Sequence, residues 1–214
     1  MSGPIASGTI PIGALDLAAL LCSRVCHDLI SPVGAIVNGL EVMDEDKDEE
    51  TRAFALDLIK KSSRQASAKL QFCRLAFGAA GSAGAQIDLG DAEKVARGLL
   101  EDDKTTITWN LPRELLPKNR VKLLLNMLMI AVATIPRGGK LTVDTIEGGT
   151  GFRVTASGLN ARLAEATSQL LAGNPTASVD AHAIQPVYTG ILARDCGLTI
   201  SAVSEGEGVI VVAQ

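Results

Sequence analysis

Histidine and aromatic residues are scarce in this chain. Only two of its 214 residues are histidine, and Phe, Trp and Tyr together make up 3%. So few rings leave no stacking platform of the kind that binds single-stranded nucleic acid. The hydrophobic content is nevertheless 47%, so the core must be built from Leu, Ile, Val and Ala, as in an ordinary globular protein.

Long runs of basic residues are also absent. Lys and Arg are scattered along the chain, and the net charge is −4, which argues against a general affinity for nucleic acid or anionic lipid. The apolar stretch from Ile10 to Leu21 is interrupted by Asp16 and has no basic segment before it. It therefore predicts neither a signal peptide nor a membrane span. We expect a cytoplasmic protein that binds neither nucleic acid nor membrane.

The four cysteines, Cys22, Cys26, Cys73 and Cys196, include no Cys-x-x-Cys pair. A metal site made of Cys22, Cys26 and His27 would spread its ligands around a helix, which disfavours it. Three of the cysteines fall on or beside apolar helical positions, where a free thiol behaves as a small hydrophobic group. The pattern predicts reduced, packed thiols and no metal site.

What the chain does have is a histidine in an unusual place. Apolar residues at spacings of three and four predict an amphipathic helix over about residues 14–43. These residues are Leu21, Val25, Leu29, Val33, Ile36, Leu40 and Met43. At about 100° per residue, the centre of this stripe lies roughly 180° from His27. A histidine kept for packing would belong to the stripe, so we expect His27 to be displayed to solvent, as a reactive imidazole requires.

A second long helix is predicted over about residues 49–77, after a solvated acidic turn from Asp44 to Glu50. So short a connection makes the two helices an antiparallel hairpin, which we assign to residues 14–79. A lone hairpin leaves an apolar seam facing water. A second copy would bury that seam in a four-helix bundle, so we expect a two-fold homodimer.

Small residues from Gly78 to Ala85 predict a linker. Beyond it, helices are predicted over about residues 91–100, 117–134, 161–171 and 180–196, with Asp91 as an N-cap. Strands are predicted over 105–111, 140–146, 152–156, 198–203 and 209–213. This order predicts an α/β sandwich over residues 86–214, with a mixed or antiparallel sheet and helices on one face. The fold class of the whole chain is therefore α+β.

The residues around His27 resemble the phospho-accepting box of sensor histidine kinases. The stretch His27-Asp28-Leu29-Ile30-Ser31-Pro32-Val33 has a histidine, an acidic neighbour and a proline five positions later. The segment from Leu123 to Gly139 similarly follows the asparagine-rich helix of those kinases. There, however, Ile130 stands where their Mg²⁺-binding asparagine is expected, and only Asn126 remains. In addition, Ala156 replaces the aspartate that reads adenine, and no glycine-rich lid is found.

These departures remove an oxygen ligand for Mg²⁺ and a main contact to adenine, so ATP binding is not expected. A chain that keeps the phospho-accepting histidine but not the ATP site resembles the histidine phosphotransferases of the ChpT type. The resemblance implies a dimer that passes phosphate from the receiver domain of a CckA-like hybrid kinase to CtrA-like and CpdR-like response regulators. It also implies that Mg²⁺ comes from the receiver partner, with no cofactor held by this chain.

Under this interpretation His27 accepts the phosphoryl group and becomes a phosphohistidine. Asp28 is expected to hold the Nδ1–H group of the ring and so to favour attack by Nε2. The plain alternative for Asp28 is an ordinary exposed carboxylate on a helix.

Four further residues are candidates for contact with the phosphoryl group or the partner. Ser31, Gly34 and Asn38 continue the ridge of His27, and Arg24 lies one turn before it. Ser31 has a structural alternative, because it can satisfy backbone groups freed by Pro32. For Arg24 the alternative is a solvated side chain.

Two other functions stay open at this point. The alternatives to a phosphotransferase are a divergent ATP-dependent histidine kinase with substitute ligands and a non-catalytic dimeric adaptor for response regulators. His182 has no acidic residue or cysteine at a telling spacing, so we interpret it as structural. We assign no role to Asn126.

Overall fold

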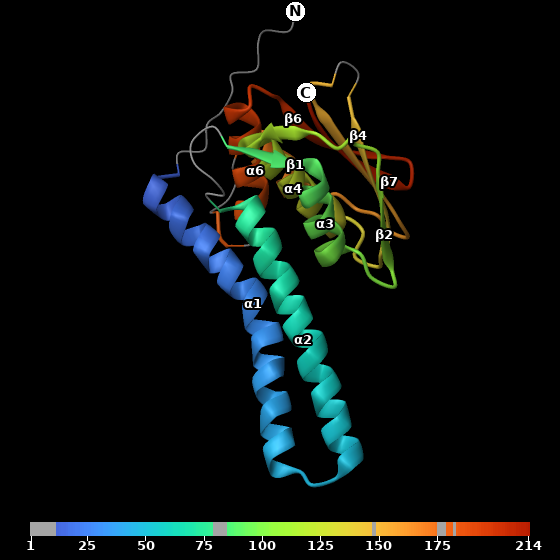
Figure 1. Cartoon of the computed structure of the whole chain (residues 1–214). Helices are drawn as coiled ribbons and strands as arrows, with labels where there is room; N and C mark the ends of the chain where they lie inside the picture. The colour runs from blue at the N-terminus through green and yellow to red at the C-terminus, as the bar shows by residue number, and fades with distance from the viewer. Residues whose placement is uncertain (1–11, 79–84, 147–148, 175–178, 182) are drawn as a thin grey trace, which may run out of the picture.

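Two long helices form a stem that projects from a sheet domain (Figure 1). The computed structural model describes residues 12–78, 85–146, 149–174, 179–181 and 183–214. Helix α1 spans Ala14–Glu45 and helix α2 spans Glu49–Ala76. Asp48 caps α2, because its carboxylate accepts a hydrogen bond from the backbone N–H of Thr51 at 2.9 Å. The predicted helical hairpin is confirmed.

The two helices of the stem approach each other through small residues. The buried residues of α1 are Pro32 and Gly39. A Cβ atom on Gly39 would lie 2.7 Å from Cγ1 of Ile59, so this position needs a glycine for close packing. Val33 and Leu40 of the predicted stripe stay 48% and 50% exposed. A single chain therefore leaves much of the apolar seam uncovered.

The sheet domain contains a mixed five-stranded sheet in the order β2-β4-β5-β7-β6. The strands are β2 (Thr105–Trp109), β4 (Gly139–Thr145), β5 (Phe152–Ser157), β6 (Ile200–Glu205) and β7 (Gly208–Ala213). Strands β2 and β4 pair in parallel, and the other pairs are antiparallel. A small second sheet, which the sequence did not predict, pairs β1 (Gln86–Asp88) with β3 (Leu115–Pro117).

Four helices pack beside the large sheet, the first three against its strands and the last mainly against neighbouring helices (Figure 1). They are α3 (Leu89–Leu100), α4 (Lys118–Ala133), α5 (Glu165–Leu171) and α6 (Ile184–Asp195). The N-cap of α3 is Asp88 and not Asp91 as predicted, since the Asp88 carboxylate accepts from the backbone N–H of Gly90 at 2.6 Å. Helix α6 begins later than predicted because Asp180 closes a turn on the N–H of Ala183 at 2.8 Å.

The core is continuous between the stem and the sheet domain. Phe72, Leu75 and Ala76, near the end of α2, belong to the same buried cluster as α3, α4 and the inner face of the sheet. Helix α4 is buried along most of its length. The base of the stem is thus fixed against the sheet domain by shared apolar burial. Most of the predicted linker, residues 79–84, lies outside the described residues, as does His182.

The thiols are less packed than the sequence predicts. All four are free, but Cys22 and Cys26 are exposed, and Cys73 and Cys196 are only partly buried. The first two lie on α1 in the region that the single chain leaves uncovered. By length and composition alone, α1 would also pass as a membrane-spanning helix, although this is weak evidence for one helix near an N-terminus.

Candidate functional site

His27 lies near the middle of α1 with its side chain 61% exposed. It is about 130° around the helix axis from the buried positions Pro32 and Gly39. The packing of the stem therefore presents the imidazole to solvent, as the helical period predicts. The ring is therefore accessible to solvent in the single chain.

Asp28 lies beside the ring and is itself held in place. Its Oδ1 is 3.5 Å from Nδ1 of His27, an ion-pair distance that is long for a hydrogen bond. Its other oxygen, Oδ2, accepts a hydrogen bond from Nε of Arg24 at 3.0 Å, one turn earlier on α1. Asp28 thus stands between a fixed cation and the Nδ1 side of the imidazole.

A lysine on the second helix supplies a hydrogen bond that this turn of α1 lacks. Pro32 has no N–H group, so the backbone carbonyl of Asp28, four residues earlier, lacks its usual helical donor. Lys69 of α2 supplies one, donating from Nζ to that carbonyl oxygen at 2.7 Å. Sequence reasoning proposed Ser31 for such a role and missed Lys69. The proline itself was the available clue, because it predicts an unpaired carbonyl that a neighbouring helix must satisfy.

Cys73 faces the same cluster from α2. Burial raises the pKa of its thiol to about 11, and the negative charge of Asp28 adds to this effect. The cations Arg24 and Lys69 act in the opposite direction but do not cancel it. At neutral pH Cys73 is therefore a neutral thiol, which places no further charge beside Asp28.

The other predicted contact residues fall into two groups. Ser31 and Asn38 are exposed, and a Cβ atom on Gly34 would meet nothing within 4 Å, so all three lie on open surface. Their positions at helical spacings continue the ridge of His27. Arg24 differs, since its side chain is only 19% exposed and turns toward the sheet domain.

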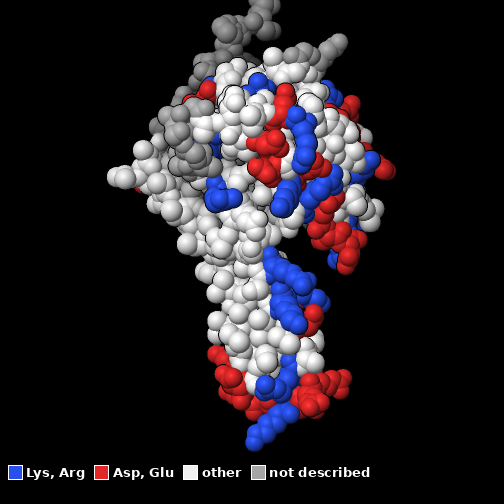
Figure 2. All heavy atoms as spheres, viewed as in Figure 1, with Lys and Arg blue, Asp and Glu red and all other residues white. Residues whose placement is uncertain are grey.

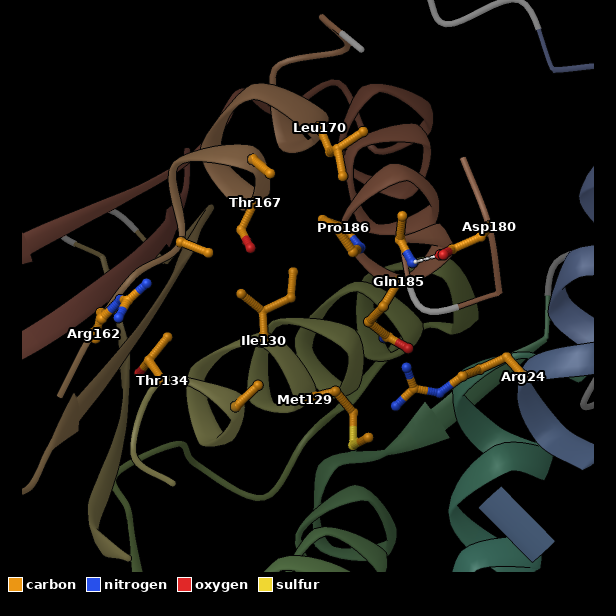
Figure 3. Close-up of a pocket in the computed structure, with 14 residues that line it drawn as sticks. Arg24, Met129, Ile130, Thr134, Arg162, Thr167, Leu170, Asp180, Gln185 and Pro186 are labelled. Carbon is orange, nitrogen blue, oxygen red and sulfur yellow. Dashed lines mark hydrogen bonds between the residues drawn. The ribbon is translucent and has the colours of Figure 1, made fainter. Parts of the chain in front are cut away.

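Arg24 lines a cavity of about 430 Å³ between the stem and the sheet domain (Figure 3). Met129 and Ile130 of α4 form much of its apolar wall, and Gln185 enters it from α6. At the end of the cavity beyond Ile130, Arg162 stands near Thr134, whose carbonyl oxygen accepts from the backbone N–H of Arg162 at 2.8 Å.

The two positions that departed from the kinase pattern are apolar in the structure. Ile130 is 4% exposed and lines this cavity. Ala156 is fully buried in β5, where it pairs with Leu141 and Val209 of the neighbouring strands. Neither side chain offers an oxygen to a metal ion or to a nucleobase.

Asn126 has a structural role that sequence reasoning did not find. It is completely buried, and its Nδ2 donates to the backbone carbonyls of Ala76 at 3.0 Å and Lys122 at 2.7 Å. Its Oδ1 accepts from Nε2 of Gln185 at 2.6 Å. One amide therefore ties the end of α2, helix α4 and helix α6 together.

Charge is distributed unevenly along the stem. Acidic side chains gather at its tip, and Lys and Arg side chains gather between the tip and the sheet domain (Figure 2). From Leu58 to Ala76, helix α2 carries five basic residues and no acidic one. The sequence prediction of scattered basic residues overlooked this stretch, although its excess of basic over acidic residues is visible in the sequence itself.

Comparison with known proteins gives consistent matches. Residues 89–208 match the family model of the histidine phosphotransferase C-terminal domain. The chain is 50% identical to "Protein phosphotransferase ChpT" of Brucella abortus (strain 2308), over 96% of this chain and 98% of that one.

Solved structures extend the comparison. A bacterial phosphotransferase that is 47% identical superposes with a TM-score of 0.87, covering 97% of this chain and 100% of the other. A more distant match, 15% identical with a TM-score of 0.43, is the histidine kinase domain of a blue-light activated kinase from Erythrobacter litoralis, covering 86% of this chain and 92% of that one. The chain therefore belongs to the ChpT-type histidine phosphotransferase family and is a protein phosphotransferase.

Proposed function

We propose that His27 carries a phosphoryl group between the aspartates of two receiver domains in a bacterial phosphorelay. One observation carries this proposal. The imidazole is exposed on a stem, and a carboxylate held by Arg24 lies 3.5 Å from its Nδ1 atom. That arrangement leaves the far nitrogen, Nε2, as the nucleophile.

The transfer is a substitution at phosphorus. The lone pair of Nε2 forms the N–P bond, and the bond from phosphorus to the receiver aspartate breaks, so that its carboxylate leaves with the electron pair. The ring keeps its proton on Nδ1 and becomes cationic, and Asp28 stabilises that cation. Attack by the aspartate of a second receiver reverses these steps and restores the neutral imidazole. We assign Mg²⁺ to the receiver partner.

Ser31, Gly34 and Asn38 form the docking ridge beside His27 in this proposal. They are polar or small and lie on open surface, which suits contact with a folded partner. The basic composition of α2 favours an anionic partner such as a phosphorylated receiver domain. The resemblance assigns the donor to a CckA-like hybrid kinase and the acceptors to CtrA-like and CpdR-like regulators.

We also propose that the chain acts as a cytoplasmic homodimer. Ile30, Val33, Val37 and Leu40 are 48–71% exposed in the single chain. A groove of about 540 Å³ continues this apolar surface between α1 and α2, lined by Leu21, Val25 and Leu70 among others. A second stem would bury both in a four-helix bundle.

ATP plays no part in the proposed reaction. Support comes from Ile130, whose apolar side chain lines the cavity of the sheet domain instead of a metal-binding amide. Calorimetry with ATP and Mg²⁺ tests this point. Micromolar affinity together with autophosphorylation would instead favour the divergent kinase.

The decisive experiment mixes the chain with a receiver domain phosphorylated on its aspartate. We expect label to move to this chain in an acid-labile, alkali-stable form, and mass spectrometry to place it on His27. His27→Ala should abolish the label. A chain that stimulates its partner equally well after that substitution would be an adaptor and not a carrier.

A further inference from the structure

Gln185 of α6 carries a buried hydrogen-bond acceptor at the junction of the stem and the sheet domain. The residue is only 5% exposed, and its side-chain oxygen Oε1 has no hydrogen-bond partner among the described residues. Leaving a buried carbonyl oxygen unpaired is costly, so the surroundings of this oxygen call for an explanation.

The orientation of this amide is fixed by its neighbours. Both hydrogen bonds from Nδ2 of Asn126 go to backbone carbonyls, which accept only, so Oδ1 of Asn126 must face Gln185. Gln185 must then offer its Nε2 there, at 2.6 Å. A flipped Gln185 amide would set two oxygens against each other. The buried network therefore directs Oε1 of Gln185 away from Asn126.

The group that faces this oxygen is the guanidinium of Arg24. Figure 3 shows the side-chain oxygen of Gln185 directed at it. No hydrogen bond joins the two residues in the part of the chain that the structure describes, but a cation is attracted to the oxygen end of an amide dipole without one. Because both side chains are mostly shielded from water, this attraction is strengthened. The cation thus offsets the cost of the buried oxygen.

The packing of α6 against α1 fixes this juxtaposition. Ile184 and Val187, which flank Gln185 in α6, form a small apolar cluster with residues near the start of α1. The α1 members of this cluster are Leu17, Leu20 and Leu21. Arg24 follows them about one turn later on the same helix. The position of Gln185 relative to Arg24 is therefore set by apolar burial in which neither of these two side chains takes part.

Arg24 also holds the carboxylate beside His27. Its Nε donates to Oδ2 of Asp28 at 3.0 Å, and Oδ1 of the same carboxylate lies 3.5 Å from Nδ1 of His27. A guanidinium is planar and carries five N–H donors in a fixed arrangement, so its Nη groups can face Gln185 while Nε holds Asp28. One side chain therefore connects the buried amide of the sheet domain with the carboxylate next to the imidazole.

We propose that Gln185 is a positioning residue for phosphate transfer and acts on His27 through Arg24 and Asp28. Gln185 restricts the guanidinium to the orientation in which Nε meets Asp28. Asp28 then keeps the ring proton on Nδ1, so that Nε2 carries the lone pair that attacks phosphorus. The sheet domain thereby contributes to the transfer without touching the reacting atoms. This inference rests on the proposed function, whereas the position of the ring proton in the unphosphorylated chain can be measured without it.

Nitrogen-15 NMR of the full, unphosphorylated chain at alkaline pH tests the positioning. It distinguishes rings protonated on Nδ1 from rings protonated on Nε2, and His182→Gln assigns the signals of His27. We expect Gln185→Met to lower the fraction protonated on Nδ1, as Asp28→Ala does. Thr189→Val is the matched control, because it removes a buried hydrogen bond of 2.7 Å from the same helix without altering the amide. An unchanged fraction in Gln185→Met, or an equal fall in Thr189→Val, would overturn the proposal.

Single-turnover transfer from a saturating phosphorylated receiver domain tests the consequence for the reaction. Gln185→Met should slow transfer about fivefold and Arg24→Met about tenfold. The double variant should be no slower than Arg24→Met alone, because Gln185 acts only through Arg24. Arg137→Met, at an exposed position, controls for the lost charge, and Thr189→Val controls for lost stability. A wild-type rate in Gln185→Met, losses that multiply in the double variant, or an equal loss in Thr189→Val would each contradict the proposal.

Arg24→Lys tests the same connection without altering the buried amide. It keeps the charge, but an ammonium group lacks the planar fork and can meet Asp28 or face Gln185, not both. We expect transfer about threefold slower than in the wild type and faster than in Arg24→Met. A wild-type rate would mean that only the charge matters and would refute the positioning. A chain that takes no label at all would instead contradict the proposed function, and the NMR measurement would then decide the positioning alone.

Discussion

The ammonium group of Lys69 donates a hydrogen bond to the backbone carbonyl oxygen of Asp28, at 2.7 Å. The proline at position 32 creates the need for this contact, since it cannot donate to that carbonyl within the helix. The turn of α1 that carries Asp28 is therefore held from the side by α2. Pro32 would weaken an isolated helix. In this stem, the carbonyl that Pro32 leaves unpaired instead bonds to Lys69 and so joins the two helices near His27.

Lys69→Met should destabilise the stem because it leaves the Asp28 carbonyl partly buried without a donor. We expect the free energy of unfolding to fall by about 1–3 kcal/mol, measured by urea denaturation. Lys60→Met, at an exposed position of the same helix, removes the same charge and should change it by less than about 0.5 kcal/mol. Equal losses in both variants would mean that the hydrogen bond contributes nothing.

Asp28→Asn should slow phosphate transfer onto His27 roughly tenfold, because the neutral amide no longer stabilises the cationic ring. Stability should fall by only about 1 kcal/mol or less, since the Arg24 pair is partly solvated. Asp57→Asn is the matched control, as it breaks an ion pair of 2.9 Å with Lys61 four residues later on α2. Single-turnover transfer from a phosphorylated receiver measures the rates. If both variants transfer at the wild-type rate, Asp28 is an ordinary surface carboxylate.

The sequence predicted the helices and strands around this site better than the side-chain contacts between them. Period and spacing placed His27 on the exposed face of a long helix, and the mixed sheet with helices on one face followed from the order of the elements. Lys69 lies 41 residues from Asp28, and Gln185 lies 59 residues from Asn126. Such pairings depend on how helices cross, which local periodicity does not record. For the same reason Arg24, predicted near the phosphoryl group, turned out to line the cavity at the sheet domain.

Asn126→Ala should be among the more destabilising single changes in the sheet domain. It removes three hydrogen bonds at once and leaves the carbonyl of Ala76 and the Nε2 group of Gln185 without these partners, whereas the Lys122 carbonyl keeps its backbone donor within the helix. We expect a loss of about 2–5 kcal/mol in chemical denaturation. Gln65→Ala, at an exposed position, controls for truncation of an amide side chain. A loss below about 1 kcal/mol would show that water replaces the missing amide.

Leu40→Lys should convert the proposed dimer into monomers, because it puts a charge into the apolar seam of α1, where Leu40 is 50% exposed in the single chain. Leu159→Lys changes a residue that is 69% exposed on the sheet domain and should leave the assembly intact. Sedimentation equilibrium distinguishes the two masses. A wild-type chain that sediments as a monomer would remove the basis for the four-helix bundle.

Cys73 gives a pH-dependent test of the cluster around Asp28. A chain carrying Cys22→Ser, Cys26→Ser and Cys196→Ser retains one thiol, whose pKa burial raises to about 11. Its alkylation by iodoacetamide should therefore reach half of its maximal rate near pH 11 in the folded chain and near the ordinary value of 9.0 after unfolding in guanidinium.

A thiol with a raised pKa binds its proton more tightly in the folded state than in the unfolded state. The stability that this contributes is fully present below the unfolded pKa and is lost as the pH rises through the folded one. Urea denaturation of the single-thiol chain should therefore show a decline between about pH 9 and 11 that Cys73→Ala lacks. A midpoint of alkylation near 9 in the folded chain would mean that Cys73 is solvated, and that Asp28 does not lie beside a buried thiol.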